Sequence, residues 1–296
     1  MENINQTLKV GRKLLQESDD LAKHYSHPAM VIRRKILRET LNVFTSITPK
    51  DYLQELASEN LSRWARERTI IDPKQKVQVI QGDWGDVTLA LTKKYGTTFA
   101  VLNMANAYVP GGGYVEGMSA QEENMFRRTD CHFHVDTNEY DRSKNQYHPE
   151  MTALIQGKHG KVYLDTDNPR ICIRGSEDKT KDNLGYPWLS KDDIFPFYEL
   201  RASAQDLRGD KTFNKNEARK KIIAQLDTLQ NKGIKYAMLG AFGCGAFLNP
   251  PEIIASIYKE EIDKRMDDFS LIAFSIFQSH EESENYRIFK EVLHVY

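Results

Sequence analysis

The feature that most constrains the fold is a change in hydrophobic pattern after Asp72 and Pro73. From there, short apolar runs alternate with segments whose apolar residues recur at helical spacing. Strands that are apolar on both faces indicate a sheet covered by helices on both sides, so we predict an α/β fold. The predicted strands are residues 77–80, 99–103, 171–173, 195–202, 235–240 and 269–277, and the predicted helices are 87–95, 119–134, 215–232, 250–264 and 283–293.

The chain before this change has a helical pattern throughout. Apolar residues recur at helical spacing in three runs, and Pro28 and Pro49 separate them. Proline suits the first turn of a helix, which supports a break before each of these two residues. We predict an all-α region that packs on the α/β domain. The runs are 8–21, 32–44 and 52–64, the helical region is 1–70, and the α/β domain is 71–296.

Charge and composition exclude several classes of protein. The 296 residues include 41 Lys and Arg against 42 Asp and Glu, which gives a net charge of −1. Proteins that wrap nucleic acid or lie on anionic membranes usually carry a basic excess, so an anionic ligand must be held by a local site. No apolar stretch approaches the roughly 20 residues of a membrane span, so we expect none.

Cysteine usage indicates a reducing compartment. The three cysteines, Cys131, Cys172 and Cys244, form no CxxC pair, so neither a disulfide framework nor a structural zinc site is expected. The first residues contain no apolar h-region, and we expect no secretory signal. We therefore expect a cytoplasmic protein.

Two predicted strands run into glycine-rich loops. One loop ends in Gly111, Gly112 and Gly113, and the other has the sequence GAFGCGAF at positions 240–247. Glycine permits positive φ and close approach of a ligand, and successive backbone N–H groups form a concave anion site. Ligands bind at the carboxyl ends of strands in such sheets, so the two loops are predicted to hold a diphosphate between them.

A simpler interpretation is that each loop is only a tight strand-to-helix connection. The pattern GxxxxGK[ST] of nucleoside triphosphatases is absent. Neither loop shows GxGxxG with an acidic residue about 20 positions later, which argues against a dinucleotide-dependent dehydrogenase. Two such loops, each followed by a predicted helix, favour the ligand-binding interpretation.

The helix after each loop carries a start signal. Ser119 and Glu122 fit the S-x-x-E capping box, which places Glu122 and Glu123 in the first turn. The second helix is predicted to start with Asn249 as the N-cap and Pro250 at the first helical position. Each helix would present the partial positive charge of its N-terminus to the preceding loop.

Glu122 and Glu123 have two interpretations. Carboxylates in a first turn stabilise a helix through its dipole, so the pair could serve only as capping residues. Beside a bound sugar, a carboxyl group can donate a proton to a leaving glycosidic oxygen or nitrogen. Adjacent helical residues point about 100° apart, so one should act on the bond while the other caps or orients. The helix N-terminus lowers the pKa of such a carboxyl group and burial raises it.

Together these motifs resemble a known family. The sequence NMANAYVPGGG, seven residues, then QEE, followed downstream by LGAFGCGAFLNPPE, is similar to the microbial poly(ADP-ribose) glycohydrolases. These enzymes belong to the macrodomain superfamily of ADP-ribose-binding α/β/α folds. The resemblance covers roughly residues 77–277 and implies an α/β/α sandwich with a mixed central sheet. A helical N-terminal region is also often found in that family.

The resemblance implies a role for each matching residue. Glu123 resembles the catalytic acid, and Glu122 resembles the neighbour that holds the ribose hydroxyls. Asn106 resembles the asparagine that contacts the distal ribose, and Phe247 resembles the aromatic residue that packs on it. The other implied ADP-ribose-binding residues are Gln121, then Gly111, Gly112 and Gly113 of the first loop, then Gly243, Cys244, Gly245 and Ala246 of the second, and either Asp83 or Asp86 near the adenine.

The chain also departs from the family pattern. Leu248 stands where many relatives have glycine, which is expected to stiffen the second loop, and the insertion 138–182 is long and polar. A metal site at Cys131, His132 and His134 is not expected, because a helix would scatter these side chains over its faces. The resemblance implies a backbone role for Cys244 rather than nucleophilic catalysis.

The sequence therefore predicts an ADP-ribosylhydrolase that cleaves the bond between the distal ribose and its acceptor, with no metal or organic cofactor. Its predicted partners are ADP-ribose and ADP-ribosylated protein, without direct nucleic acid binding, and we expect a monomer. The alternatives are a reader that binds ADP-ribose without cleaving it, and an interaction protein with a vestigial macrodomain. The low net charge favours terminal or single ADP-ribose units, including arginine-linked ones. A pathogen effector delivered into a host cytosol is a further hypothesis.

Overall fold

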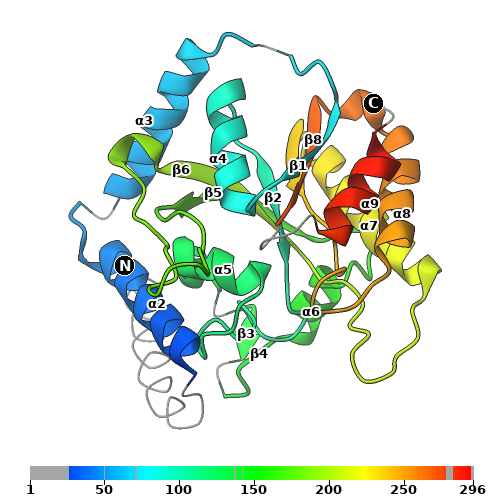
Figure 1. The fold of residues 1–296 in the computed structure, drawn as a ribbon, viewed down its shortest axis with the longest axis horizontal. Coiled ribbons are helices and arrows are strands. Elements are labelled where there is room, and N and C mark those ends of the chain that lie inside the picture. The colour runs from blue at the N-terminus through cyan, green and yellow to red at the C-terminus, as the bar shows by residue number, and fades with distance from the viewer. Residues whose placement is uncertain are drawn as a thin grey trace.

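The computed structural model describes residues 27–49, 51–70, 72–136, 138–141, 143–277 and 283–294. A six-stranded sheet with the order β1-β8-β7-β2-β6-β5 forms its centre (Figure 1). The strands from β1 to β6 in this order are parallel, and β5 pairs antiparallel with β6. The strands are β1 Val77–Gln81, β2 Ala100–Met104, β5 Tyr163–Cys172, β6 Phe195–Ala202, β7 Tyr236–Leu239 and β8 Leu271–Ile276, and a separate pair consists of β3 Tyr140–Asp141 and β4 Gln146–Tyr147.

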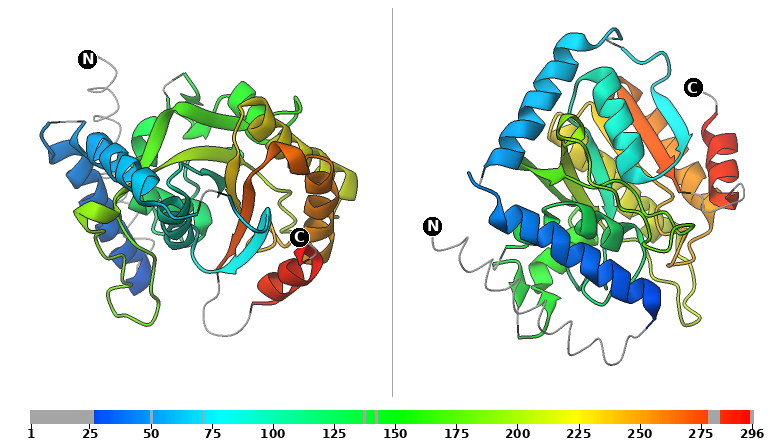
Figure 2. Two further views of the ribbon diagram at one scale, coloured as in Figure 1. Left: turned by 90° about the horizontal axis from the view of Figure 1, so that it is seen from above. Right: turned by 60° about the vertical axis from the view of Figure 1, so that its left-hand side comes forward.

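Helices cover both faces of this sheet, because alternate strand residues point to opposite sides. Ala100 and Leu102 of β2 belong to an apolar cluster with α7, α8 and α9, whereas Val101 belongs to a cluster with α4 and α5 on the other face. Figure 2 shows the two layers on either side of the sheet. The helices are α4 Trp84–Tyr95, α5 Gln121–Arg128, α6 Pro149–Ile155, α7 Lys215–Asn231, α8 Pro251–Asp263 and α9 Glu284–Leu293.

The predicted fold class is confirmed: the domain is an α/β/α sandwich with a mixed central sheet. None of the helices in the described ranges is both long and apolar enough to cross a membrane. The parallel strands bring their carboxyl ends to one edge of the sheet, and both glycine loops start at this edge.

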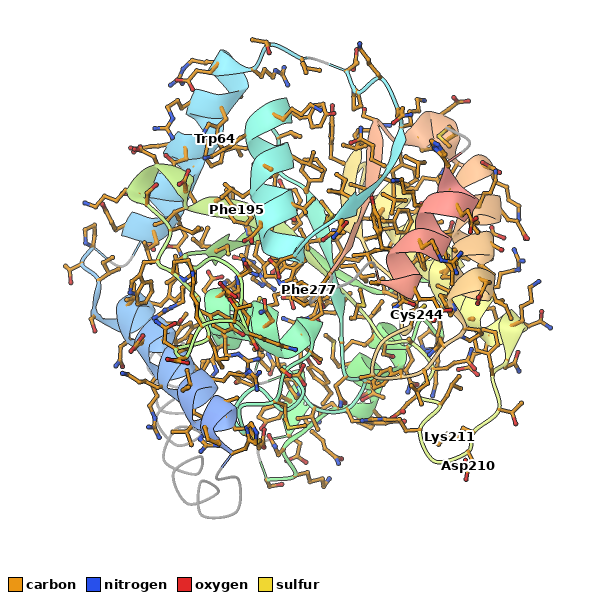
Figure 3. The ribbon with its side chains drawn as sticks, in the orientation of Figure 1. Trp64, Phe195, Asp210, Lys211, Cys244 and Phe277 are labelled. Atoms are coloured by element: carbon orange, nitrogen blue, oxygen red, sulfur yellow. The ribbon has the colours of Figure 1, made fainter. Side chains whose placement is uncertain are left out.

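Two helices precede the sheet, α2 Pro28–Ser46 and α3 Tyr52–Glu67, as the second and third helical runs predicted. The first run lies outside the described residues. Leu37 and Leu41 of α2, with Trp64 of α3, join the apolar cluster that covers the α4 and α5 face. Figure 3 shows Trp64 beside α4. The division into a helical region 1–70 and a domain 71–296 stays a prediction.

Three predicted boundaries were wrong, each for a local reason. Helix α4 starts at Trp84 rather than residue 87, because the Asp83 carboxylate accepts the N–H of Gly85 at 2.8 Å and caps it. Helix α5 ends at Arg128, since Thr129 pairs with Cys172 of β5 and a separate 3₁₀ turn, Cys131–His134, follows. Strand β5 starts at Tyr163, well before residue 171, and the sequence did not show this because the first half of the strand is polar and half exposed.

Candidate functional site

The candidate site lies at the carboxyl ends of β2 and β7. We call residues 105–120, which follow β2, the first glycine loop, and residues 240–250, which follow β7, the second glycine loop. Strands β2 and β7 are direct neighbours in the sheet, so the two loops emerge side by side. The topology thus brings together the two motifs that the sequence places far apart.

Gln121 fixes the start of α5 against the end of β2. Its side-chain oxygen accepts the N–H of Met104 at 2.9 Å, and its side-chain nitrogen donates to the carbonyl oxygen of Leu102 at 2.8 Å. Both partners are backbone groups at the carboxyl end of β2. Gln121 therefore sets where the two following glutamates stand.

Glu122 and Glu123 bind different parts of the first glycine loop. Glu122 is 3% exposed, and its carboxylate accepts the N–H of Asn106 at 2.6 Å and that of Gly111 at 3.1 Å. Glu123 is half-buried and accepts the N–H of Gly113 at 3.0 Å through Oε1. The buried carboxylate holds the loop at two points, while the other is held at one and remains partly open.

The predicted capping box is absent. The N-cap of α5 is Ala120, without a side-chain cap, and Glu122 turns toward the loop instead of back toward Ser119. The two carboxylates also converge more than their positions on the helix imply. A Cβ on Gly112 would lie 2.5 Å from Glu123 Oε1 and 3.2 Å from Glu122 Oε2. Their side chains are long enough to reach the same glycine from adjacent helical positions.

Burial outweighs the helix N-terminus at Glu122. Removal from water, followed by the charge of Glu123, raises its pKa well above the usual value, although the N–H of Asn106 acts in the opposite direction. A buried carboxyl group beside a second carboxylate is the arrangement that separates a pair of acids into two roles. The sequence alone did not show whether the helix N-terminus or burial has the larger effect on this pKa.

Glycine is required at Gly111 and Gly112 of the first loop. Both have positive φ, 72° and 56°, and a side chain on Gly111 would meet the ring of Tyr114 at 2.6 Å. Asn106 shapes the start of the loop, because its Oδ1 accepts the N–H of Tyr108 at 2.8 Å and that of Val109 at 3.0 Å. The sequence-predicted residues of this loop therefore stand together, around the two carboxylates.

The second glycine loop is closed on one side and open on the other. Gly243 has φ 77°, and a Cβ there would lie 2.4 Å from Ala204, whereas one on Gly245 would meet nothing within 4 Å. Gly245 and Ala246 are exposed, and Phe247 is half-buried. Burial, followed by the charge of Glu252, raises the pKa of Cys244 to about 12, which agrees with a backbone role.

Two expectations about the second loop need correction. Helix α8 has Pro250 as its N-cap, and Asn249 does not cap it. The Asn249 side-chain nitrogen instead donates to the carbonyl oxygens of Gln205 at 2.7 Å and Gly243 at 3.2 Å, which closes the loop from inside. Leu248 is 64% exposed with φ 60°, so this position keeps the left-handed backbone that favours glycine.

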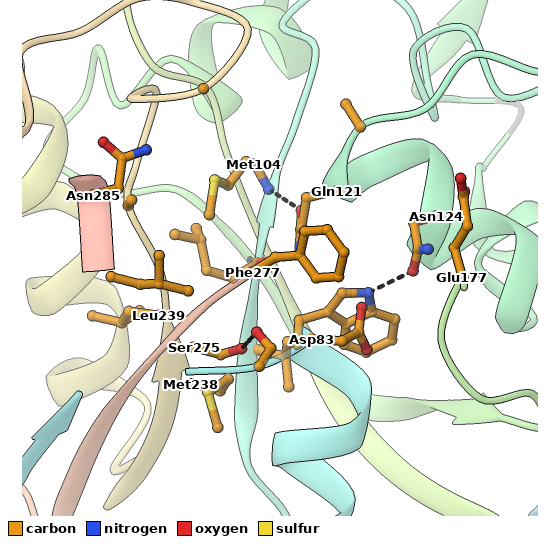
Figure 4. Close-up of a pocket in the computed structure, with 18 of the residues that line it drawn as sticks. Asp83, Met104, Gln121, Asn124, Glu177, Met238, Leu239, Ser275, Phe277 and Asn285 are labelled. Atoms are coloured by element: carbon orange, nitrogen blue, oxygen red, sulfur yellow. Dashed lines mark hydrogen bonds between the residues drawn. The ribbon is translucent and has the colours of Figure 1, made fainter. Parts of the chain in front are cut away.

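A first cavity of about 250 Å³ opens between the ends of β1, β2, β7 and β8 (Figure 4). Asp83 lines it and Asp86 does not, and which of the two lies near an adenine stays a prediction. Asp83 Oδ1 accepts hydrogen bonds from Arg128 Nη1 at 2.5 Å and from the N–H of Gly85. The other carboxylate oxygen, Oδ2, is therefore left for a ligand. Phe277, at the end of β8, lies across this cavity beside Gln121.

A second cavity of about 300 Å³ lies beyond the two loops. Asn106 of the first loop and Phe247 of the second both line it, so the loops separate the two cavities. The rest of its wall comes from Gln156 at the end of α6, from the segment after β6, and from α7, and it includes Ser203 and Lys221. The predicted site residues are thus distributed along one edge of the sheet, with a cavity at each end.

Sequence reasoning missed Phe277, Ser203 and Lys221. Phe277 directly follows the carboxyl end of an apolar strand, the same signal that identified the glycine loops, and that signal could have found it. Lys221 lies inside an amphipathic helix, where a lysine normally indicates the solvent side. Only the packing of α7 on the segment after β6 reveals its burial.

The Cys131–His134 segment offers no metal site in the structure. The described residues include no group of three or more His, Cys, Asp or Glu side chains that could hold an ion. His132 is buried and its Nδ1 lies 2.7 Å from the hydroxyl of Tyr114, while burial lowers its pKa to about 4. Its neutral ring contacts Tyr114 of the first glycine loop.

Comparison with known proteins gives a family match for part of the chain. Residues 38–156 match the model of the microbial-type PARG catalytic domain, where PARG is poly(ADP-ribose) glycohydrolase. This segment holds the first glycine loop and both glutamates, and the second glycine loop lies outside it. The model describes the catalytic domain of a glycohydrolase, which agrees with the predicted class of enzyme. No curated protein matches the chain.

Solved structures of two bacterial PARG proteins share the fold. PARG from Thermomonospora curvata has a TM-score of 0.60 at 20% identity, over 88% of this chain and 98% of that chain. The same protein bound to the inhibitor ADP-HPD gives 0.59 at 19% identity, with the same coverage. PARG from Deinococcus radiodurans in complex with ADP-ribose gives 0.53 at 20% identity, over 84% of this chain and 93% of that chain. Residues 38–156 thus resemble the catalytic domain of a microbial-type PARG, and the chain has the fold of the bacterial PARG structures.

Proposed function

We propose that this protein is a hydrolase that releases ADP-ribose by cleaving the bond between its distal ribose and an acceptor. The observation that carries the proposal is the pair Glu122 and Glu123, which both bind the backbone of the first glycine loop. A carboxyl pair placed at a glycine cradle fits cleavage of a glycosidic bond beside a bound phosphate.

In this proposal the two loops hold the diphosphate through backbone N–H groups, with Gly245 giving the open approach. The first cavity takes the adenosine, with Asp83 Oδ2 accepting from the base and Phe277 against its face. Asn106 and Phe247 contact the distal ribose at the entrance of the second cavity. The ligand would therefore cross the sheet edge from one cavity to the other.

The proposed chemistry divides between the two glutamates. Glu122 orients the ribose hydroxyls, because its carboxyl group is buried and already fixed by two N–H groups. Glu123, which keeps one oxygen free of the loop, donates a proton to the leaving oxygen or nitrogen as the bond to the anomeric carbon breaks. Water then adds to the oxocarbenium-like carbon, and its proton returns to Glu123.

A reader that binds ADP-ribose without cleaving it is the alternative, since the loops and cavities alone suffice for binding. The partly open carboxyl group of Glu123 favours the enzyme, because binding through backbone N–H groups has no use for an acid there. Incubation with ADP-ribosylated protein and with poly(ADP-ribose), followed by chromatography of released ADP-ribose, separates the two. Release from either substrate supports the hydrolase, and tight ADP-ribose binding without any release identifies the reader.

A further inference from the structure

A buried tyrosine that the proposed mechanism does not use lies at the centre of a hydrogen-bond network. The hydroxyl of Tyr186 donates to Glu177 Oε2 at 2.6 Å. It accepts from Asn124 Nδ2 at 3.2 Å and from Arg127 Nε at 3.3 Å. A hydroxyl group has one donor and two acceptor positions, so all three are used. The side chain is fully buried, and burial raises the pKa of Tyr186, so the donated proton stays in place.

Two of the three partners lead to the end of the first glycine loop. Arg127 Nη2 donates to the carbonyl oxygen of Met118 at 2.6 Å. Glu177 accepts from Arg33 of α2 with both carboxylate oxygens, at 2.7 Å and 3.1 Å, and Arg33 Nη1 donates to the carbonyl oxygen of Gly117 at 3.3 Å. Burial alone would raise the pKa of Glu177, but hydrogen bonds from Arg33 and from the hydroxyl lower it, so it accepts as a carboxylate. One hydroxyl is thus connected to two successive carbonyl groups of the loop.

The third partner leads to the first cavity. Asn124 lines this cavity, and its Oδ1 accepts from Trp84 Nε1 at 2.9 Å and from Arg128 Nη1 at 3.0 Å. Arg128 Nη1 also donates to Asp83, the residue to which the proposed function assigns the base. Glu177 lines the same cavity, and Figure 4 shows it on the same side as Asn124. The network therefore joins the wall of the first cavity to the first glycine loop.

The backbone that carries this hydroxyl has an unusual conformation. Leu184, Gly185 and Tyr186 all have positive φ, at 59°, 68° and 52°. A left-handed backbone is unfavourable for leucine and tyrosine, and it persists only where the surrounding structure holds it. Here the side chains of Leu184 and Tyr186 belong to one apolar cluster with Ile36 of α2. Helix α2 thus holds the tyrosine in place, and such conformations are concentrated at functional sites.

We propose that Tyr186 is a positioning residue that holds the wall of the first cavity and the end of the first glycine loop in one fixed arrangement. It lines neither cavity, so it acts through its hydrogen-bond partners. The same loop binds the carboxylate of Glu123 through the N–H of Gly113 at 3.0 Å, so its geometry sets the position of the proposed acid. The inference rests on the proposed function and adds a residue that connects its binding and catalytic parts.

Tyr186→Phe tests the inference, because it removes the hydroxyl and leaves the ring in its apolar cluster. Calorimetry with AMP reports on the first cavity, and kcat for release of ADP-ribose reports on the loop. The affinity for AMP should fall about fivefold, since Asn124 and Glu177 each lose a hydrogen bond. The value of kcat should fall about tenfold, because a small displacement of the loop moves Glu123 relative to the bond that it protonates.

Tyr258→Phe is the matched control. Tyr258 is also fully buried, and its hydroxyl donates to Gln225 of α7 at 2.7 Å, in the apolar cluster on the opposite face of the sheet from α5. This variant should change neither the affinity for AMP nor kcat. Arg33→Lys is a second test should Tyr186→Phe fail to fold. It keeps the charge but loses the paired hydrogen bonds to Glu177, so it should lower both quantities in the same direction.

Wild-type values of both quantities in a folded Tyr186→Phe protein would overturn the inference. A loss of AMP affinity with unchanged kcat, or the reverse, would also overturn it, because the hydroxyl would then serve only one of the two structures. Equal losses in Tyr258→Phe would show a general response to a missing buried hydroxyl. A wild type that binds ADP-ribose without releasing it refutes the proposed hydrolase instead. The gain in affinity from AMP to ADP-ribose then reports on the loop in place of kcat.

Discussion

At the scale of single residues, two adjacent glutamates with different surroundings form the centre of the site. Glu122 is buried and its carboxylate is occupied by two N–H groups, whereas Glu123 uses one oxygen for the loop and has the other open. The same residue type therefore serves two purposes, because one position of the helix faces the protein interior and the next faces the loop surface. This difference in contacts predicts different effects of substitution.

Glu123→Gln keeps the size of the side chain and removes the proton-donating carboxyl group. General acid catalysis typically contributes 10²–10⁴-fold, so hydrolysis of ADP-ribosylated substrate should fall by about that factor. Affinity for ADP-ribose, measured by calorimetry, should stay within several-fold because the phosphate loops supply most of the contacts. Wild-type hydrolysis by this variant would show that Glu123 is not the acid.

Gly245→Glu tests the phosphate role of the second loop without disturbing the fold. Its Cβ would meet nothing within 4 Å, so the thermal unfolding midpoint should not change. The added carboxylate would face the diphosphate, and ADP-ribose affinity should fall at least about tenfold. Gly245→Ala, which adds no charge, is the matched control and should lose much less. Unchanged affinity in a folded Gly245→Glu protein would mean that the loop is only a turn.

At the scale of elements, helix α2 supports the first glycine loop from outside. Arg33 Nη1 donates to the carbonyl oxygen of Gly117 at 3.3 Å, and Arg34 Nη1 donates to that of Glu116 at 2.9 Å. Arg33 also forms an ion pair with Glu177, which lines the first cavity. Both arginines are thus buried between α2 and the loop that carries the site.

Gly117→Ala should weaken this contact between α2 and the loop. A Cβ there would lie 2.4 Å from the carbonyl oxygen of Met30, and the residue has φ 88°. Relief of the clash requires backbone movement, so the free energy of unfolding should fall by about 2 kcal/mol in denaturant titration. ADP-ribose affinity should fall too, because the loop moves with the helix.

Gly233→Ala provides the control for this prediction. Gly233 has φ 68° but a Cβ there would meet nothing within 4 Å, so the variant carries the strain of a positive φ without the clash. It lies after α7, away from both cavities, and should retain ADP-ribose affinity. An equal loss of stability in the two variants would show that α2 does not press on the loop.

The sequence predicted the buried elements well and the partly exposed ones poorly. Strand β6 matched its predicted bounds because all but one of its residues are buried, and most of them are apolar or aromatic even though Glu199 and Arg201 interrupt the run. The insertion 138–182 was described as polar, yet it forms β3, β4, α6 and the whole of β5. The exposed residues of α6 and β5 show no period that would distinguish a helix from a strand. Both glycine loops were found, because apolar strands lead directly into them.

Side-chain roles were harder to predict than positions. The S-x-x-E pattern at Ser119 and Glu122 indicated a cap. In the structure the Glu122 carboxylate binds the N–H groups of Asn106 and Gly111 in the loop instead. A local pattern cannot show a partner that lies eleven or more residues away in sequence. The burial of Lys221 could not be predicted for the same reason, because its hydrogen-bond acceptors belong to other elements.

At the scale of the whole molecule, buried charges couple the fold to pH. Glu199 of β6 is fully buried and forms ion pairs with Arg170 at 2.9 Å and with Arg201 at 2.8 Å. Burial alone would raise its pKa, but Arg201 and Arg170 lower it to about 2. The paired carboxylate lies in the same sheet that carries the site, so acid should weaken the site together with the sheet.

Stability should therefore fall with pH in two steps. His132 has a pKa of about 4 in the fold against roughly 6.5 unfolded, so between these values the unfolded chain binds the extra proton and stability decreases as pH falls. Glu199 has a pKa of about 2 against roughly 4.3 unfolded, so its contribution is lost below pH 4.3. Glu122 acts in the opposite direction, because its raised pKa makes the folded state bind its proton first.

Comparing wild type with His132→Asn isolates the first step, since Glu122 and Glu199 are common to both proteins. Asparagine can still accept the hydrogen bond from Tyr114 but does not titrate. Urea titrations from pH 7 to pH 4 should show the wild type losing up to about 3 kcal/mol more than the variant, which is the value of 2.5 pKa units. The difference should appear below pH 6.5 and level off near pH 4. Parallel pH profiles would mean that His132 is protonated in the folded protein as readily as in the unfolded chain.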